Sequence, residues 1–279
     1  MASNNEERVE ERVEERVERG NINDLITTSI DGKIAKLKVE QLVLLAKELD
    51  IELTKIKKNK KTKKTKKDLL DGITDKFNTI TIEDKIDIFK KTNIGFELEI
   101  KNILDKNIDI NDLVNSNVCL TLTKFFETNK NLEKLFNNTC DLQNINNSIK
   151  SLNCVKTDAQ GLYILTICKN NINYIVKLGS FAESQGMHKR ITSFGGGNYE
   201  TGSLTNKWFQ KFIKLALEQG FTSKFTYYNK IQEKIKVVNL DGGETEIIPY
   251  VIRPLETKLF DKYNSTNNNI PPIFGSNCL

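Results

Sequence analysis

One stretch of sequence, GLYILTICKNNINYIVKLGS at residues 161–180, restricts the fold of this chain more than any other. Two apolar runs rich in β-branched and aromatic residues are separated by the polar turn Lys169-Asn170-Asn171. This pattern is typical of two strands joined by a tight turn. We therefore expect a β-hairpin here, with Tyr163 on its first strand and Lys177 on its second.

The chain after residue 154 alternates between strand patterns and helix patterns. Strands are expected at residues 162–168, 174–178, 225–227, 234–239 and 245–251, and helices at 183–194, 208–219 and after Pro254. The turn Asp241-Gly242-Gly243 is expected to join the last two strands. These elements predict an α+β fold for residues 154–279, in which a small antiparallel sheet is flanked by helices.

The chain before residue 154 divides into segments that differ in charge and periodicity. Residues 1–32 hold nine carboxylates and four arginines, and a Glu-Glu-Arg-Val repeat puts like charges four residues apart. We expect a charged, flexible tail there; a short helix that associates with another helix is the alternative. Residues 75–153 carry apolar residues at helical spacing between asparagine-rich turns, which predicts a helical spacer or accessory region.

Residues 33–74 contain the most basic part of the chain. Thirteen lysines outnumber four carboxylates between residues 33 and 67, which gives a net charge of +9. Apolar spacing predicts a helix over 39–50 and a second, shorter helix over 67–73. Lysines that neutralise phosphates release condensed counterions and so favour binding to any nucleic acid sequence. Nine lysines in the intervening segment are the candidate DNA-binding residues: Lys55, Lys57, Lys58, Lys60, Lys61, Lys63, Lys64, Lys66 and Lys67.

Composition argues against several classes of protein. No run of eighteen apolar residues occurs and the N-terminus lacks an apolar core, so we expect an intracellular protein of the cytoplasm or nucleus, with no membrane span and no secretory signal. Five scattered cysteines and a single histidine, His188, lack the spacing of a zinc site. We expect reduced thiols and no small-molecule cofactor.

The order of four short motifs resembles the GIY-YIG nuclease family. Gly161-Leu162-Tyr163 matches the first motif, and Lys177-Leu178-Gly179 matches the second, with lysine where tyrosine is usual, as in one branch of the family. Arg190 follows on an expected helix, and Glu256 lies on a later one. The resemblance covers the chain from about residue 154. It implies an endonuclease that hydrolyses phosphodiester bonds in DNA with Mg²⁺ or Mn²⁺.

The resemblance also implies a role for each of these residues. Tyr163 would lie beside the attacking water and assist its deprotonation, and Lys177 would act on that water or contact phosphate. Arg190 would bind the scissile phosphate, and Glu256 would bind the metal. From the residues alone, Tyr163 could be a half-buried tyrosine on a strand, and Lys177 could be a lysine that faces solvent. Because Lys189 directly precedes Arg190, the residue that matches the family's arginine stays open by one position.

Glu256 has a physical argument of its own. Helical spacing puts it on one face with Leu259, Phe260 and Tyr263, and a carboxylate in an apolar stripe is costly unless it binds a metal or a cation. An ion pair with a neighbouring Arg253 or Lys258 is the alternative. Family members also carry a downstream asparagine near the metal or phosphate, for which four residues compete: Asn267, Asn268, Asn269 and Asn277.

The two helices expected around the lysine run resemble the SAP-type DNA-binding module, whose second helix would open here with Lys-Lys-Asp-Leu-Leu. In this chain the lysine run replaces the glycine turn that is usual in that family. A basic linker beside a lone helix is the alternative. Together the two resemblances predict a DNA-binding endonuclease; the rival reading is a non-catalytic DNA-binding or chromatin-associated protein with a degenerate nuclease fold.

Overall fold

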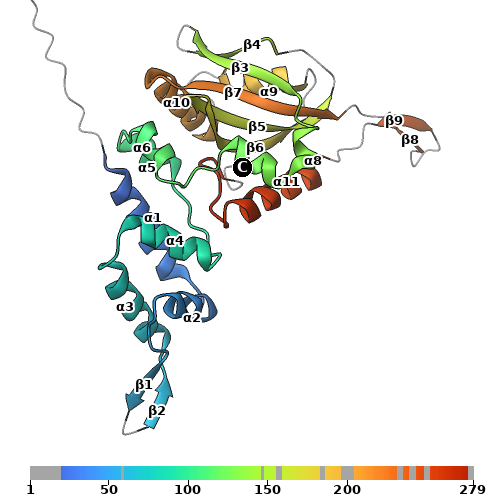
Figure 1. Ribbon diagram of the computed structural model, residues 1–279. Coiled ribbons are helices and arrows are strands. Elements are labelled where there is room, and N and C mark those ends of the chain that lie inside the picture. The colour runs from blue at the N-terminus through green and yellow to red at the C-terminus, as the bar shows by residue number, and fades with distance from the viewer. Residues whose placement is uncertain are drawn as a thin grey trace, which may run out of the picture.

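The computed structural model describes residues 20–57, 60–145, 148–154, 159–182, 186–195, 204–230, 235–238, 243–247 and 252–275. These residues form two lobes, one helical and one built around a five-stranded antiparallel sheet (Figure 1). The chain is therefore an α+β protein with helices around an antiparallel sheet, as predicted. No helix in the described ranges is both long and apolar enough to cross a membrane.

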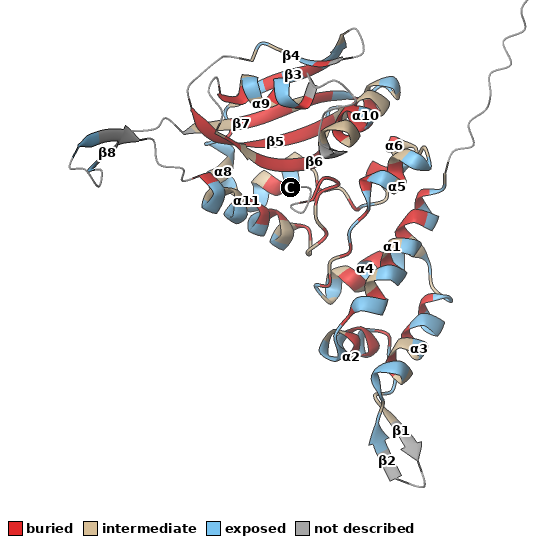
Figure 2. Ribbon diagram, turned by 180° about the vertical axis from the view of Figure 1, so that it is seen from behind, coloured by how far each residue is buried: buried red, intermediate tan, exposed pale blue. Residues whose placement is uncertain are grey.

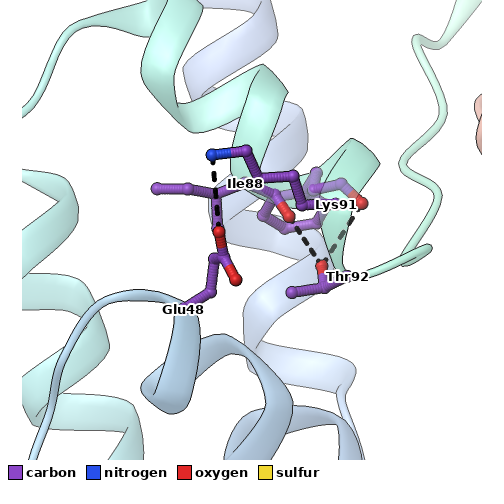
Figure 3. Close-up of polar contacts among 5 residues, drawn as sticks. Glu48, Ile88, Lys91 and Thr92 are labelled. Atoms are coloured by element: carbon purple, nitrogen blue, oxygen red, sulfur yellow. Dashed lines mark hydrogen bonds and ion pairs between the residues drawn. The ribbon is translucent and has the colours of Figure 1, made fainter.

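The helical lobe is built by short helices that share one apolar core. Its elements are α1 (Ile22–Lys36), α2 (Val39–Glu48), α3 (Lys66–Phe77), α4 (Ile82–Lys91), α5 (Ile100–Asp105) and α6 (Ile110–Asn115). The helices predicted over 39–50 and 67–73 are confirmed as α2 and α3. Leu45 and Phe89 are 0% exposed in the core between them. At the surface, Lys91 of α4 makes a 3.4 Å ion pair with Glu48 of α2 (Figure 3).

The flexible tail expected up to residue 32 differs from the structure, because α1 begins at Ile22. Leu25, Ile26 and Ile30 lie on one face of this helix, and each is 0% exposed. The carboxylates and arginines that set the net charge of this segment lie mainly between residues 6 and 19. Taking residues 1–32 as one charged segment obscured the helical spacing of the apolar residues that follow residue 19. Residues 1–19 lie outside the described residues.

The lysine run between α2 and α3 forms a hairpin, where a basic turn was expected. Strand β1 (Thr54–Lys57) pairs with β2 (Lys60–Lys63) in an antiparallel ladder that runs from Thr54 opposite Lys63 to Lys57 opposite Lys60. This hairpin projects from the end of the helical lobe that lies away from the sheet (Figure 1).

The sheet lobe contains β3 (Asn138–Ile145), β4 (Ser148–Leu152), β5 (Gln160–Lys169), β6 (Ile172–Phe181) and β7 (Thr222–Lys230), in the order β4-β3-β7-β5-β6. The predicted hairpin is confirmed as β5 and β6, and Asn170 and Asn171 adopt the positive φ values, 52° and 64°, that its tight turn requires. A second hairpin, β8 (Ile235–Val238) and β9 (Glu244–Ile247), projects from this lobe (Figure 1).

Side chains that alternate along β5 enter two different cores. Tyr163, Leu165 and Ile167 pack toward α9 (Gly186–Gly195) and α10 (Leu204–Glu218). Leu162 and Ile164 pack toward α7 (Leu122–Thr128), α8 (Lys130–Glu133) and α11 (Ile252–Thr266). The inner part of the sheet is therefore covered on both faces: β5 and β6 are mostly buried, whereas β3 and β4 are buried only in part (Figure 2).

The helical spacer expected for residues 75–153 is helical only in part, because it supplies β3 and β4 of the main sheet. In β3 the side chains of Cys140 and Leu142 are buried, and most of their neighbours are polar and exposed. So short an alternation of apolar and polar residues, in an asparagine-rich sequence, resembles a turn more than a strand. The sheet lobe thus begins well before the expected boundary at residue 154, since α7 also packs against β6 and α11.

Polar contacts join the two lobes. Lys169, the last residue of β5, donates to Asn111 Oδ1 at 2.6 Å and to the carbonyl of Gln219 at 3.2 Å. Gln219 Oε1 accepts from the backbone nitrogen of Ile110 at 2.7 Å. Elsewhere, Asn269 donates to the carbonyl of Asn93 at 3.0 Å. These contacts place the start of α6 and the loop after α4 directly against the sheet lobe.

Candidate active site

Tyr163 and Gly179 are paired across β5 and β6, and the tyrosine side chain lies over the glycine. A Cβ atom on Gly179 would lie 2.4 Å from Tyr163 Oη and 2.5 Å from its Cζ. No side chain fits in that space, so glycine is required for this position of the phenol ring. Gly179 thus makes room for the ring of Tyr163, which extends to the edge strand β6.

Two aromatic rings pack against the ring of Tyr163. The ring centroids of Phe225 and Phe194 lie 5.2 Å and 6.3 Å from that of Tyr163, and the interplanar angles of 89° and 80° make both contacts edge-to-face. Tyr163 is 0% exposed in this arrangement. The half-buried position weighed in the sequence analysis is thus replaced by full burial within an aromatic cluster.

Glu256 approaches the same point of β6 from α11. Its Oε2 accepts a 2.7 Å hydrogen bond from the hydroxyl of Ser180, the residue after Gly179. Successive strand residues face opposite sides of a sheet, so Tyr163 and Glu256 reach neighbouring residues of one edge strand from two sides. Glu256 is half-buried beside the buried Leu259 and Tyr263, as its helical spacing predicted.

Arg190 lies on α9 and stacks on the ring of Phe194, with its Cζ atom 4.8 Å from the ring centroid. Phe194 in turn meets the ring of Tyr163, so one aromatic ring separates the guanidinium group from the tyrosine. Arg190 is half-buried, whereas its neighbour Lys189 is exposed. This difference favours Arg190 as the residue fixed near Tyr163.

Lys177 lies on β6 two residues before Gly179, on the face that Tyr163 occupies. It is only 7% exposed, which disagrees with a solvent-facing lysine. Its Nζ atom lies 5.7 Å from the ring centroid of Phe274, whose backbone nitrogen donates to the carbonyl of Val176 at 2.9 Å. The C-terminal segment therefore packs on β6 beside this lysine.

Of the four candidate asparagines, the three that the structure describes lie in or beside the turn after α11. Asn267 is buried and donates to the carbonyls of Ile270 at 2.8 Å and Val118 at 3.2 Å. Asn268 and Asn269 take positive φ in the turn after α11. Asn277 lies outside the described residues. The three described asparagines shape this turn, and the partner that holds Glu256, Ser180, was missed although it directly follows the Lys-Leu-Gly motif.

The described candidate DNA-binding lysines lie on β1, on β2, at the start of α3 and, for Lys64, between β2 and α3. Lys63, Lys66 and Lys67 are exposed, and Lys64 is half-buried. Lys55, Lys57, Lys60 and Lys61 belong to the described backbone of the hairpin, and Lys58 lies outside the described residues. His188, left outside the predicted site, is a half-buried residue of α9.

The possible metal ligands near Glu256 suit a divalent cation that keeps most of its water ligands better than one bound entirely by protein side chains. No three His, Cys, Asp or Glu side chains gather as metal ligands in the part of the chain that the structure describes. Glu256 offers one oriented carboxylate at a half-exposed position. Mg²⁺ retains several waters and often binds through one or two carboxylates. The residues present therefore fit such an ion at Glu256.

No protein-family model matches the chain, and no curated protein matches its sequence. Four chains of solved structures are similar in chain trace, and two of them are the following. A mutant of bacteriophage T4 EndoII is 20% identical, with 48% of this chain and 95% of that chain covered and a TM-score of 0.33. The restriction endonuclease HPY188I in complex with product DNA is 17% identical, with 63% and 90% covered and a TM-score of 0.28.

Proposed function

We propose that this protein is a DNA-binding endonuclease that hydrolyses phosphodiester bonds with a divalent metal ion, through a site of the GIY-YIG type. One observation carries the proposal: Tyr163 from β5 and Glu256 from α11 meet at the adjacent residues Gly179 and Ser180 of the edge strand β6. A phenol, an oriented carboxylate and two cations then lie around the edge strand β6, with Tyr163 and Glu256 on its two faces.

These groups match what phosphodiester hydrolysis requires. Tyr163 would lie beside the attacking water and assist its deprotonation, and Lys177, on the same face of β6, would support the negative charge that develops. The planar guanidinium of Arg190 binds two oxygens of the scissile phosphate. Glu256 would hold Mg²⁺ or Mn²⁺ in an orientation fixed by Ser180. A metal bound there supplies positive charge at the leaving oxygen.

The basic segment supplies the second half of the proposal. Residues 33–74 would act as a SAP-like module in which α2, the lysine hairpin and α3 hold DNA. Thr65 caps α3 and forms a reciprocal pair with Asp68, so the lysines at the start of this helix stand on a fixed element. Sequence-independent affinity for the phosphate backbone is the expected property of this module.

A specific observation favours a second candidate function. Tyr163 is 0% exposed and packs against the rings of Phe194 and Phe225, so its ring meets water only after these side chains move. If they do not move, the chain is a non-catalytic DNA-binding or chromatin-associated protein that retains a nuclease-like site.

The experiment that separates these functions measures cleavage by the full chain. Supercoiled plasmid, branched DNA and single-stranded DNA are incubated with Mg²⁺, with Mn²⁺ or with a chelator. The endonuclease proposal predicts cleavage of at least one substrate that the chelator abolishes. Binding to DNA without metal-dependent cleavage of any of the three would support the non-catalytic function.

A further inference from the structure

The lysine hairpin has a shape that specifies how DNA is held. We propose that β1 and β2 form a ribbon that enters the major groove of duplex DNA. The inference rests on the proposed DNA-binding function and adds to it: it names the duplex as the ligand and the groove as the contact, beyond a general attraction between lysine and phosphate.

The dimensions of the hairpin suit only one of the two grooves. Strands of four residues extend over about 13 Å, and paired strands lie about 5 Å apart before side chains are added. The major groove of B-DNA is about 12 Å wide and 8.5 Å deep and admits a two-stranded ribbon, whereas the minor groove is about 6 Å wide. The ribbon is therefore long enough to reach the floor of the major groove and too broad for the minor groove.

The positive charges of the hairpin favour a polyanion as its binding partner. The register sets Lys57 opposite Lys60, and like charges directly opposite each other destabilise a ladder. Among the described strands, β1 and β2 pair only with each other, and two-stranded hairpins are marginally stable in water. The phosphates that line both rims of a groove would neutralise these lysines and so stabilise the ribbon.

The base of the hairpin is anchored so that the ribbon projects as a unit. The backbone nitrogen of Lys64 donates to the carbonyl of Leu53 at 2.9 Å, and the hydroxyl of Thr54 donates to Glu52 at 2.9 Å. The flanking helices α2 and α3 pack against each other, and Leu45 of α2 and Leu69 of α3 are both buried. Figure 2 shows this hairpin extending beyond the buried core of the helical lobe.

The test measures how the full-length Glu256→Gln protein protects the bases of a short DNA duplex from chemical methylation. This measurement does not depend on cleavage of the DNA. Dimethyl sulfate methylates guanine N7 in the major groove and adenine N3 in the minor groove, so one reagent reports both grooves. At saturating protein, guanine N7 should be protected and adenine N3 should remain reactive. The double variant Lys57→Gln/Lys60→Gln should lose the N7 protection.

The matched control is Lys66→Gln/Lys67→Gln, which removes the same charge from exposed positions on α3. It should lower DNA affinity and its salt dependence but keep the N7 protection, and Lys57→Arg/Lys60→Arg should also keep it. Protection of adenine N3, protection of neither groove, or N7 protection that survives in Lys57→Gln/Lys60→Gln would overturn the inference. None of these results bears on metal-dependent cleavage by the native chain, which is measured separately.

Discussion

The hydroxyl of Ser180 donates a 2.7 Å hydrogen bond to Oε2 of Glu256 and so ties α11 to the edge strand of the sheet. The two residues are far apart in sequence and meet only in the folded chain. Because Ser180 directly follows Gly179, the carboxylate is fixed next to the point where the phenol of Tyr163 crosses the same strand. A partner of this kind orients a metal ligand and restricts its rotation.

Removal of the Ser180 hydroxyl should weaken metal binding without unfolding the protein. We expect Ser180→Ala to require about 10- to 100-fold more Mg²⁺ for half-maximal cleavage, the range typical of lost partners of metal ligands. Ser180→Thr should restore most of the loss, and Ser265→Ala on the exposed part of α11 is the control. An unchanged Mg²⁺ requirement in folded Ser180→Ala would show that the bond does not position a ligand.

The contact between Tyr163 and Gly179 should appear as an energetic coupling. Gly179→Ala places a methyl group 2.4 Å from Tyr163 Oη and should lower the free energy of unfolding by about 1 to 3 kcal/mol. In a Tyr163→Ala background the same change should cost much less, because the obstructing ring is absent. Urea unfolding of the four proteins measures the coupling, and additive losses would contradict the close approach.

Alkaline pH should destabilise the core between the sheet and α11. Burial raises the pKa of the Cys119 thiol from 9.0 to about 12, and burial also raises the pKa of the Tyr263 hydroxyl. Between pH 9 and 12 the folded state therefore binds more protons than the unfolded state, so the free energy of unfolding falls as pH rises. Each group contributes a slope of at most about 1.4 kcal/mol per pH unit.

The variant Cys119→Ala isolates the thiol from other groups that titrate at high pH. Its free energy of unfolding should fall less steeply than that of the native chain above pH 9, while the two slopes agree between pH 6 and 8. Equal slopes above pH 9 would mean that the Cys119 thiol ionises equally well in the folded and unfolded chains.

The strands contributed by residues 138–152 give a prediction about fragments. A fragment that begins at residue 118 keeps β3, β4 and α7 with the rest of the sheet, and it should unfold cooperatively. A fragment that begins at residue 151 lacks β3 and α7, so β7 loses one of its two neighbouring strands and the core around Leu162 and Ile164 is exposed. Such a fragment should show no cooperative unfolding transition. Thermal unfolding followed by circular dichroism distinguishes them, and equal transitions would contradict the strand order.

The sequence was sufficient where periodicity and turn chemistry act locally. Apolar runs on both sides of Asn170-Asn171 predicted β5 and β6, and the 3.6-residue spacing of Glu256, Leu259 and Tyr263 predicted the buried face of α11. By contrast, β3 and β4 were missed because polar side chains surround their few buried residues. A strand of this kind is recognisable only once β7 is present to pair with it.

The sequence proposes members of the candidate site but does not specify their arrangement. Motif order makes Tyr163, Lys177, Arg190 and Glu256 candidates. The full burial of Tyr163 depends on Phe225, a ring that lies far along the chain, and the partner of Glu256 depends on how α11 docks on β6. Such contacts follow from tertiary packing, which local spacing does not specify.

The most direct test of the account is the effect of Glu256→Gln on cleavage, DNA affinity and melting temperature, measured on one preparation. The amide retains the shape of the side chain and can still accept from Ser180, but it lacks the charge that a divalent ion requires. We predict that the variant stays folded, binds DNA with unchanged affinity and loses nearly all Mg²⁺-dependent cleavage, whereas Asp261→Asn on the same helix cleaves normally. Full cleavage by folded Glu256→Gln would contradict the assignment of the metal site and of the proposed active site built around it.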